Sequence, residues 1–545
     1  MVKPTKQQDK IITALGNLVV IAKPGSGKTF VISEKIRSIL QEAVQFKGVI
    51  AISFTNKASN ELKKRCLKNG LDPKGSFFGT IDKFILSEIA IPFAKHIFGM
   101  PNCELKIIKL KEADESQQHF YENYYDGTKV VNTSIDLVKQ IGVDFIAGTI
   151  CLEFAGTLAR YILETSPACR RYLKARYTDV FIDEYQDSGE DQHEIFIKLQ
   201  SLGITAIAVG DVDQSIYAFS GKDSRYLLAL AKDKNFKFLP LTTNHRSHAS
   251  IVNYASAFIS TEAELIDTDK VMVFEKIVHG DETCIAVWIS SKVKEIMVTF
   301  GIENKKEIGV LVRSDRTGQY IDASLTIPHR YFTTTGLDSD VSRWSELFRK
   351  MLYFMYDPKI TRVEVVADIY DATRNRTELK DLYLKLYQLR ELGRDVSANI
   401  IEIIDLFEGC ARIIYPKSES LRSIVLLRDV LSSSSLIKNY VPAGNDELQI
   451  MTLHKSKGLE FDVVFHLDLY EWIMPGKKIE DNVQVFNDID QDWNLHYVGI
   501  TRAKKACFLC RSTRRHNFQN VIKTGNTSEF LTMHELKGLR ENSPW

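Results

Sequence analysis

Residues 18–29, LVVIAKPGSGKT, constrain this chain more than any other segment. A short apolar run, which is typical of a buried strand, leads into a glycine-rich turn and then into Lys-Thr. In a loop of this type the backbone N–H groups surround phosphates, the lysine reaches the β- and γ-phosphates, and the threonine hydroxyl binds magnesium. The segment therefore predicts a phosphate-binding loop made by Ala22, Lys23, Pro24, Gly25, Ser26, Gly27, Lys28 and Thr29.

A second segment, FIDEYQD at residues 181–187, supplies the carboxylates that such a loop needs. Its apolar start predicts another buried strand, and its acidic residues would stand at the end of that strand. Asp183 is predicted to complete the Mg²⁺ site with Thr29, and Glu184 to orient and deprotonate the attacking water. Together the two segments predict that the chain binds and hydrolyses a nucleoside triphosphate.

The composition is that of an ordinary globular protein, with 44% hydrophobic and 26% charged residues over 545 positions. This length allows about three or four domains. The net charge of +1 means that any surface for nucleic acid must be a local groove. The longest apolar runs are too short to cross a bilayer, and the first ten residues lack the apolar core of a signal peptide. No membrane association is expected.

Eight cysteines are scattered along the chain, and only Cys507 and Cys510 form a C-x-x-C pair. A zinc or iron–sulfur site would need a second pair or a nearby histidine cluster. We therefore interpret the pair as core thiols on a strand, in a reducing cytosol.

Short β-rich runs alternate with polar, helix-like stretches in two parts of the chain, which is the rhythm of parallel sheets covered by helices. A long helical stretch without that rhythm interrupts each part. The sequence thus predicts an α/β fold with two domains, each carrying a helical insertion. The predicted boundaries are 1–84 and 179–250 for the first domain, 85–178 for its insertion, 251–340 and 441–515 for the second domain, 341–440 for its insertion, and 516–545 for a C-terminal tail.

Further segments, in order, resemble the motifs of superfamily 1 DNA helicases of the UvrD/Rep type, over roughly residues 5 to 510. They are PTKQQ at 4–8, AISFTNKASNELKKR at 51–65, VGDVDQSIYAF at 209–219, NHRS at 244–247, TLHKSKGLEF at 452–461 and YVGITRA at 497–503. The resemblance implies two RecA-like motor domains, each with an inserted subdomain, the second insertion being reduced. It also implies that the nucleotide is ATP.

The resemblance assigns roles around the nucleotide. Gln8 would read the adenine edge, His245 would place a ring on the adenine, and Glu460 would bond the ribose. Gln214 would sense the γ-phosphate, and Arg246 and Arg502 would neutralise its charge. With Lys28, Asp183 and Glu184, these last three complete the predicted catalytic set.

The same resemblance implies that the chain binds single-stranded or tailed DNA. Bases stacked on aromatic rings are held without regard to sequence. The alternative, that Tyr217 and Phe219 are core aromatics, remains open at this stage, and His454 could be a hydrogen-bonded structural histidine. The predicted DNA-binding residues are Phe54, Thr55, Asn56, Tyr217, Phe219 and His454.

Several positions depart from the usual helicase pattern. Ser220 follows Phe219 where a Trp-Arg pair is usual, Asp82 replaces a histidine, and Trp493-Asn494 replaces paired arginines. Residues 79–99 and 181–196 resemble, more narrowly, the helicase-like subunits of two-gene Gabija antiphage systems. That resemblance implies a bacterial cytosolic protein that docks on a nuclease subunit of the OLD type, with ATPase-like and Toprim domains.

Three functions remain in competition. The first is a DNA-stimulated ATPase that translocates on single strands in the 3′–5′ direction and unwinds DNA, within a defence complex. The second is a regulatory ATPase that senses DNA ends for a bound nuclease and unwinds little. The third is a compact repair helicase that acts alone. A signalling ATPase without DNA is disfavoured by the 51–65 segment and by the aromatic residues beside Gln214.

Overall fold

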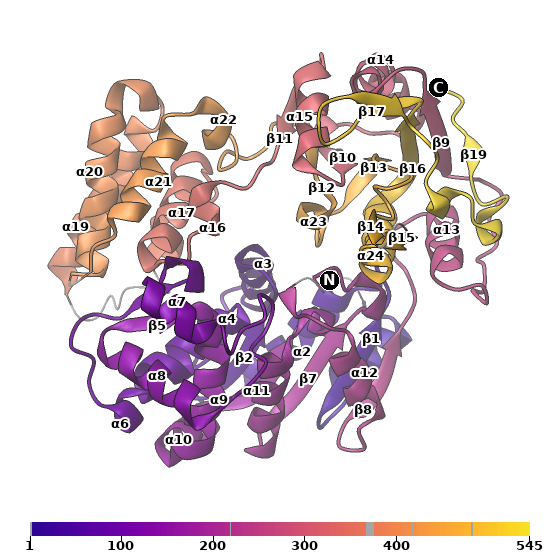
Figure 1. The fold of residues 1–545 in the computed structure, drawn as a ribbon. Helices are drawn as coiled ribbons and strands as arrows, with labels where there is room; N and C mark the ends of the chain where they lie inside the picture. Colours follow the sequence, from indigo (N-terminus) through magenta and orange to yellow (C-terminus); the bar gives the residue numbers. More distant parts are fainter. Residues whose placement is uncertain (1–2, 218–219, 367–374, 417, 481–482) are drawn as a thin grey trace.

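The computed structural model describes residues 3–217, 220–366, 375–416, 418–480 and 483–545. Two parallel β-sheets form its frame, one of six strands and one of seven. Each sheet is the centre of one motor domain, and each motor domain carries a mainly helical insertion (Figure 1). This architecture confirms the predicted fold class.

The first sheet has the strand order β3-β2-β6-β7-β1-β8, and every neighbouring pair is parallel. Its central strands are continuous apolar runs because helices cover both faces. The strands are β1 (Leu18–Ala22), β2 (Gly48–Ile52), β3 (Phe77–Gly79), β6 (Tyr177–Ile182), β7 (Thr205–Gly210) and β8 (Lys237–Leu241). The helices of this domain are α1 (Lys6–Thr13), α2 (Lys28–Glu42), α3 (Asn56–Cys66), α11 (Glu190–Ser201) and α12 (Arg225–Lys232).

The first insertion shares one hydrophobic core with the first sheet, through buried residues such as Phe84, Tyr121 and Phe154. A π-helical turn over Ile85–Ala90 joins its first two helices. Its elements are α4 (Ile81–Phe84), α5 (Ile91–Phe93), α6 (Lys95–Phe98), α7 (Glu115–Tyr121), α8 (Ile135–Ile146), α9 (Ala155–Thr165), α10 (Pro167–Arg176) and a parallel pair of strands, β4 (Lys106–Ile108) and β5 (Thr149–Cys151).

The second sheet, of order β11-β12-β10-β13-β16-β9-β19, is also parallel throughout. Its strands are β9 (Val273–Val278), β10 (Ile308–Val312), β11 (His329–Tyr331), β12 (Leu448–Thr452), β13 (Phe461–His466), β16 (Ala503–Ser512) and β19 (Glu541–Asn542). The helices are α13 (Ala249–Ile259), α14 (Glu282–Thr299), α15 (Asp315–Ser324), α23 (Leu453–Ser456) and α24 (Ile489–Thr501), and a hairpin of β14 (Lys477–Glu480) and β15 (Val483–Phe486) precedes α24.

Residues 516–545, predicted as a tail, pack on the second motor domain. The strands β17 (Arg514–His516) and β18 (Ile522–Thr524) form a hairpin, β19 extends the sheet beside β9, and Phe530 and Leu536 are buried. These strands have only two or three residues each and no continuous apolar run, so the sequence pattern did not reveal them.

The second insertion is a helical body with a hydrophobic core of its own. It lies next to the first insertion (Figure 1), and the contacts between the two include exposed or partly exposed ion pairs. Such pairs contribute about 0–1 kcal/mol each, so they join the insertions only loosely. The helices are α16 (Gly336–Ser339), α17 (Arg343–Tyr356), α18 (Arg362–Val366), α19 (Arg376–Leu392), α20 (Val396–Ile414), α21 (Leu421–Leu431) and α22 (Ser434–Ile437).

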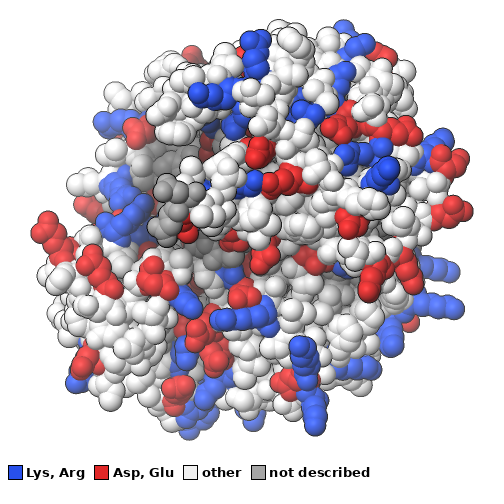
Figure 2. All heavy atoms as spheres, turned by 45° about the vertical axis from the view of Figure 1, so that its right-hand side comes forward, with Lys and Arg blue, Asp and Glu red and all other residues white. Residues whose placement is uncertain are grey.

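Acidic and basic side chains are mixed on the face of the molecule that Figure 2 shows. On the face in Figure 2, Lys and Arg lie among Asp and Glu rather than in one broad basic field. This distribution agrees with the net charge of +1. A nucleic-acid contact on this molecule must therefore be local.

The thiols of Cys507 and Cys510 are buried on β16, as predicted for core cysteines. Within the described ranges, none of the helices combines the length and the apolar character needed to cross a bilayer.

Close packing in the second sheet leaves no room for a side chain at Gly309 on β10, which can be tested by substitution. A Cβ atom there would lie 2.7 Å from the ring of Phe461 on the neighbouring strand, so Gly309→Ala overpacks a buried layer. We expect the free energy of unfolding to fall by about 1–3 kcal/mol. The control, Gly409→Ala on α20, meets only Lys385 atoms at 3.5 Å and should be neutral or stabilising. Thermal unfolding followed by circular dichroism compares the two, and equal stability would contradict the packing argument.

Candidate functional site

The predicted phosphate loop runs from the end of β1 to the first turn of α2. Gly25 and Gly27 have φ angles of +70° and +91°, a region that favours glycine. A Cβ atom on Gly25 would lie 2.7 Å from the Asn244 side chain, and one on Gly27 would lie 2.7 Å from the Gln8 side chain. The two glycines therefore serve both the turn itself and the close approach of neighbouring segments.

Residues predicted to contact the base lie against this loop. The Gln8 amide donates to the Ser26 carbonyl at 3.0 Å, and the His245 N–H donates to the Gly25 carbonyl at 2.9 Å. Asn244, which the sequence analysis left without a role, donates to the Pro24 carbonyl at 2.9 Å and accepts from the N–H of Arg246 at 2.7 Å. The segment that carries Arg246 is thus bonded directly to the phosphate loop.

Two predicted catalytic acids stand at the end of β6, facing Lys28. The ammonium of Lys28 lies 3.6 Å from a Glu184 carboxylate oxygen, and Gln186 donates to the other oxygen at 2.5 Å. Glu184 has a φ angle of +56°. This backbone conformation is uncommon for residues other than glycine and is found often at functional sites. Asp183 accepts the N–H of Glu184 at 3.0 Å. The Asp183 carboxylate is therefore oriented by the backbone of the turn, and the Glu184 carboxylate by the side chains of Gln186 and Lys28.

Burial sets the charges in this cluster. Burial and the neighbouring Glu184 charge raise the pKa of the Asp183 carboxyl above its ordinary value. Burial also raises the pKa of Asp211, at the end of β7, to about 6. For Glu184 burial acts in the same direction, but Lys28 and Lys457 outweigh it and lower its pKa. A cation bound nearby would thus stabilise the ionised carboxylates of Asp183 and Asp211.

The residues fit a magnesium ion that is shared with nucleotide phosphates. Thr29, in the first turn of α2, and the buried Asp183 offer the hydroxyl and the carboxylate oxygen that Mg²⁺ uses beside phosphates. In the described part of the chain, no three His, Cys, Asp or Glu side chains gather closely enough to hold a metal by themselves.

Arg502, which follows α24 in the second motor domain, reaches into the first. It is 2% exposed, and it donates to the Gln214 side-chain oxygen at 3.1 Å and to the Leu459 and Val498 carbonyls at 3.1 Å each. Burial and the nearby Arg246 lower the pKa of Arg502 to about 10, which leaves it charged at neutral pH. Gln214 in turn donates to Asp211 at 2.9 Å. A continuous bonded chain therefore joins the second motor to the acids beside the loop.

Arg246 and Glu460 are paired with each other across the two motors. The guanidinium Nε lies 2.7 Å from a Glu460 carboxylate oxygen, and Glu460 is about half exposed. The residues predicted to contact the γ-phosphate and the ribose thus stand side by side at the seam between the domains.

Three of the predicted DNA-binding aromatics come together. The rings of Phe54 and Tyr217 are stacked with centroids 4.5 Å apart, and His454 lies 6.0 Å from Tyr217. Burial and the nearby Arg313 lower the pKa of His454 to about 4, so it is neutral at physiological pH. These rings come from both motor domains and meet at the seam.

The other predicted DNA-binding residues are placed differently. Thr55 caps the N-terminus of α3 by accepting the Ala58 N–H at 3.1 Å, and Asn56 begins that helix; both are exposed. Phe219 lies outside the described residues. Trp493, at a position where an arginine is usual, stacks on Phe258 in the core of the second motor at 4.5 Å.

Lys457 is a site residue to which the sequence analysis gave no role. Its ammonium contacts the Asp187 carboxylate at 2.5 Å and the Gln214 carbonyl at 2.6 Å, and it lies 5.0 Å from the centre of the Tyr217 ring. Both Lys457 and Asp187 fall inside quoted motifs, 452–461 and 181–187. The sequence contained both Lys457 and Asp187, but no feature of it indicated that these two side chains contact each other.

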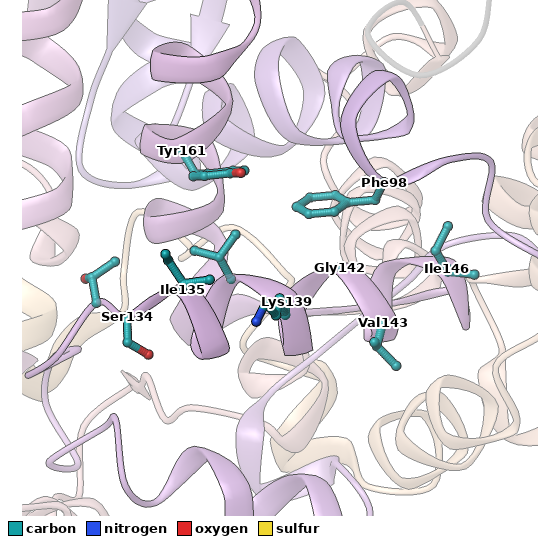
Figure 3. Close-up of a pocket in the computed structure, with 10 residues that line it drawn as sticks. Phe98, Ser134, Ile135, Lys139, Gly142, Val143, Ile146 and Tyr161 are labelled. Carbon is teal, nitrogen blue, oxygen red and sulfur yellow. The ribbon is translucent and has the colours of Figure 1, made fainter.

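A separate hollow of about 840 Å³ lies on the first insertion (Figure 3). Phe98 and Tyr161 face the apolar side of α8, where Ile135 and Val143 are 75% and 60% exposed. The residues that line it include none of those predicted to bind nucleotide or DNA. Its apolar lining distinguishes it from a phosphate-binding site.

The geometry of the acids yields a direct test at Glu184. We expect Glu184→Gln to bind nucleotide with parental affinity and to lose kcat by roughly 10²–10⁴-fold, because an amide cannot accept the proton of the attacking water. The control is Glu194→Gln, an exposed position on α11, which should hydrolyse at the parental rate. Titration with a fluorescent nucleotide and steady-state hydrolysis measure the two quantities. Parental turnover in Glu184→Gln would assign the base elsewhere.

Comparisons with known proteins show the family to which the chain belongs. The family profile of the UvrD/REP helicase N-terminal domain matches residues 4–100 and 99–235, and that of the UvrD-like helicase C-terminal domain matches residues 356–514. The chain is 27% identical to Gabija protein GajB of Bacillus cereus, over 94% of this chain and 96% of that protein.

Two ATP-dependent DNA helicases are similar over comparable lengths. Rep of Buchnera aphidicola is 23% identical over 96% of this chain and 95% of its own length. PcrA of Bacillus subtilis is 23% identical over 94% of this chain and 83% of its own length. The two family profiles together match more than half of the chain, which therefore belongs to the UvrD-like family of DNA helicases.

Proposed function

We propose that this protein is a DNA-stimulated ATPase that moves along single-stranded DNA in the 3′–5′ direction. The observation that carries the proposal is the contact of Arg502 of the second motor with the Gln214 side-chain oxygen of the first at 3.1 Å, since Gln214 is itself bonded to the buried Asp211. Phosphoryl transfer needs charge on the γ-phosphate to be neutralised from several sides. Nucleotide would therefore pull the two motors together, and hydrolysis would release them.

In the first step, nucleotide would rearrange the charges around Lys28. The ammonium that now faces Glu184 would turn to the β- and γ-phosphates, because these carry more negative charge than one carboxylate. Loss of this partner would let the pKa of Glu184 rise, which makes it a better acceptor for the proton of water. Thr29 and Asp183 would hold Mg²⁺, whose charge would be shared between the phosphates and the buried acids.

In the second step, Arg246 and Glu460 would exchange partners. Their mutual ion pair would be replaced by contacts of Arg246 with the γ-phosphate and of Glu460 with the ribose. The pair holds the two side chains at the seam between the motors. Nucleotide binding would thus separate one partly exposed ion pair, and the free-energy cost of this separation is small.

DNA would act through the aromatic cluster at the same seam. Because stacking contributes about 1–3 kcal/mol per base, Tyr217→Ala should raise the DNA concentration for half-maximal ATPase stimulation by about 5–150-fold. The control, Tyr387→Ala, removes a tyrosine that is 56% exposed on the second insertion. ATPase rates titrated with a single-stranded oligonucleotide measure the effect. An unchanged titration would make the Phe54–Tyr217 pair a structural contact.

We further propose that the protein works in the bacterial cytosol as one subunit of an antiphage complex with a nuclease. The similarity to GajB over almost the whole of both chains supports this, as does the loss of cations expected at Ser220 and near Trp493. Fewer cations near the DNA backbone weaken binding and flatten its salt dependence. A regulatory ATPase with little unwinding, and a compact repair helicase, are the competing functions.

Strand displacement separates these functions. We expect the isolated protein to unwind a tailed duplex weakly, and to gain activity when it is co-expressed with a nuclease subunit of the OLD type. The matched arm is the isolated Glu184→Gln variant, which should unwind nothing. Efficient unwinding of several hundred base pairs by the protein alone would favour the repair helicase.

A further inference from the structure

The segment 214–217 follows β7 of the first motor but packs on the second. Ile216 is fully buried, and its side chain belongs to the hydrophobic cluster that contains Leu453, Leu495 and Val498 of the second motor. Tyr217 packs against the same cluster. A loop that carries the proposed γ-phosphate sensor therefore has Ile216 in the core of the opposite domain, whereas the Tyr217 ring lies between that core and Phe54 of the first motor.

Three successive backbone carbonyls of this segment accept side-chain donors of the second motor. The Gln214 carbonyl accepts the Lys457 ammonium at 2.6 Å. The Ser215 carbonyl accepts the Asn494 amide at 2.8 Å, and the Ile216 carbonyl accepts the Gln491 amide at 3.1 Å. The loop is thus bonded along its backbone, and not only through its side chains.

The bonds back to the first motor are of a different kind. Gln214 donates to Asp211 at 2.9 Å, and the Ser215 hydroxyl donates to the Gln186 carbonyl at 3.2 Å. The Gln214 N–H also donates to the Asp211 carbonyl at 3.1 Å. In these three bonds the loop is the donor, whereas the second motor donates to the backbone carbonyls of residues 214–216. The loop is therefore hydrogen-bonded to both motors at the same time.

Gln491 and Asn494 occupy the first turns of α24 and lie three residues apart, on one face of the helix. Asp488 caps this end by accepting the Gln491 N–H at 3.0 Å. Arg502 follows the other end and donates to the Gln214 side chain. Residues on α24 and directly after it thus bind both the backbone of the 214–217 segment and the side-chain oxygen of Gln214.

We propose that Asn494 and Gln491 are positioning residues that fix the 214–217 segment to α24, so that Gln214 and Tyr217 move with the second motor. Both donors are neutral amides, which bind carbonyl oxygens without adding positive charge beside Arg502 and Lys457. The inference rests on the proposed function for its kinetic consequence: DNA at Tyr217 changes hydrolysis only while this link holds.

The test replaces Asn494 by two residues of opposite hydrogen-bonding character. Asn494→Asp keeps the shape but sets a carboxylate against the Ser215 carbonyl, whereas Asn494→Gln keeps an amide donor. Asn253→Asp is the matched control, because Asn253 is buried on α13 and also donates to a backbone carbonyl, that of Ile266 at 2.7 Å, which lies outside the 214–217 segment.

With saturating single-stranded DNA, we expect Asn494→Asp to lower kcat by about 10-fold, since it loses a bond and leaves a buried carbonyl unpaired. The KM for ATP should stay within about twofold, because no nucleotide contact changes. Asn494→Gln should recover most of the rate, and Asn253→Asp should keep the parental stimulation. The defect of Asn494→Asp should shrink relative to the parent as the pH falls, because a protonated carboxyl can donate again.

Hydrogen–deuterium exchange gives a readout that does not depend on DNA. Peptides covering residues 211–217 should exchange faster in Asn494→Asp than in the parent and in Asn253→Asp. Unchanged exchange together with parental kcat would overturn the inference, as would equal defects in Asn494→Asp and Asn494→Gln. If the parent shows no stimulation by DNA, the proposed function fails, and the exchange data still decide whether the amides hold the loop.

Discussion

Parallel pairing of β1, β6 and β7 is the constraint on which the site depends. Register places Ile21 opposite Gly210 and Ile182 opposite Ala208, so that all three strands end at one edge of the sheet. Whatever follows them must meet there: the phosphate loop, the pair Asp183-Glu184, and Asp211. The cost of burying these acids together is met by Lys28 from the same edge and by cations from the other motor.

Buried hydrogen bonds and ion pairs join the two motors at this edge. Arg502, Lys457, Asn494 and Gln491 all donate to oxygen atoms of the 211–217 region or of Asp187. Buried hydrogen bonds that involve charged groups contribute more than exposed ones. The ion pairs between the two insertions are partly exposed and therefore weaker. The interface near the nucleotide is the part of the molecule best suited to transmit a change of state.

Much of the site could be predicted because its residues lie in short continuous motifs. A strand, a glycine turn and Lys-Thr predict a local conformation that depends little on the rest of the chain, and the φ angles of Gly25 and Gly27 agree with it. The same holds for Asp183 and Glu184, which a single strand end presents together. The role of Lys457 could not be predicted, because its partner Asp187 is 270 residues away and its side chain must cross a domain boundary.

By itself, therefore, the sequence determined the fold class and indicated the phosphate loop and the pair Asp183-Glu184, since these follow from local periodicity and turn chemistry. Only the tertiary structure decided that the 214–217 segment packs on the second motor. It also decided that the last thirty residues complete the second sheet and that Trp493 turns into the core while Asn494 faces the loop. These outcomes depend on the burial of side chains against partners far away in the chain, and no local pattern specifies such partners.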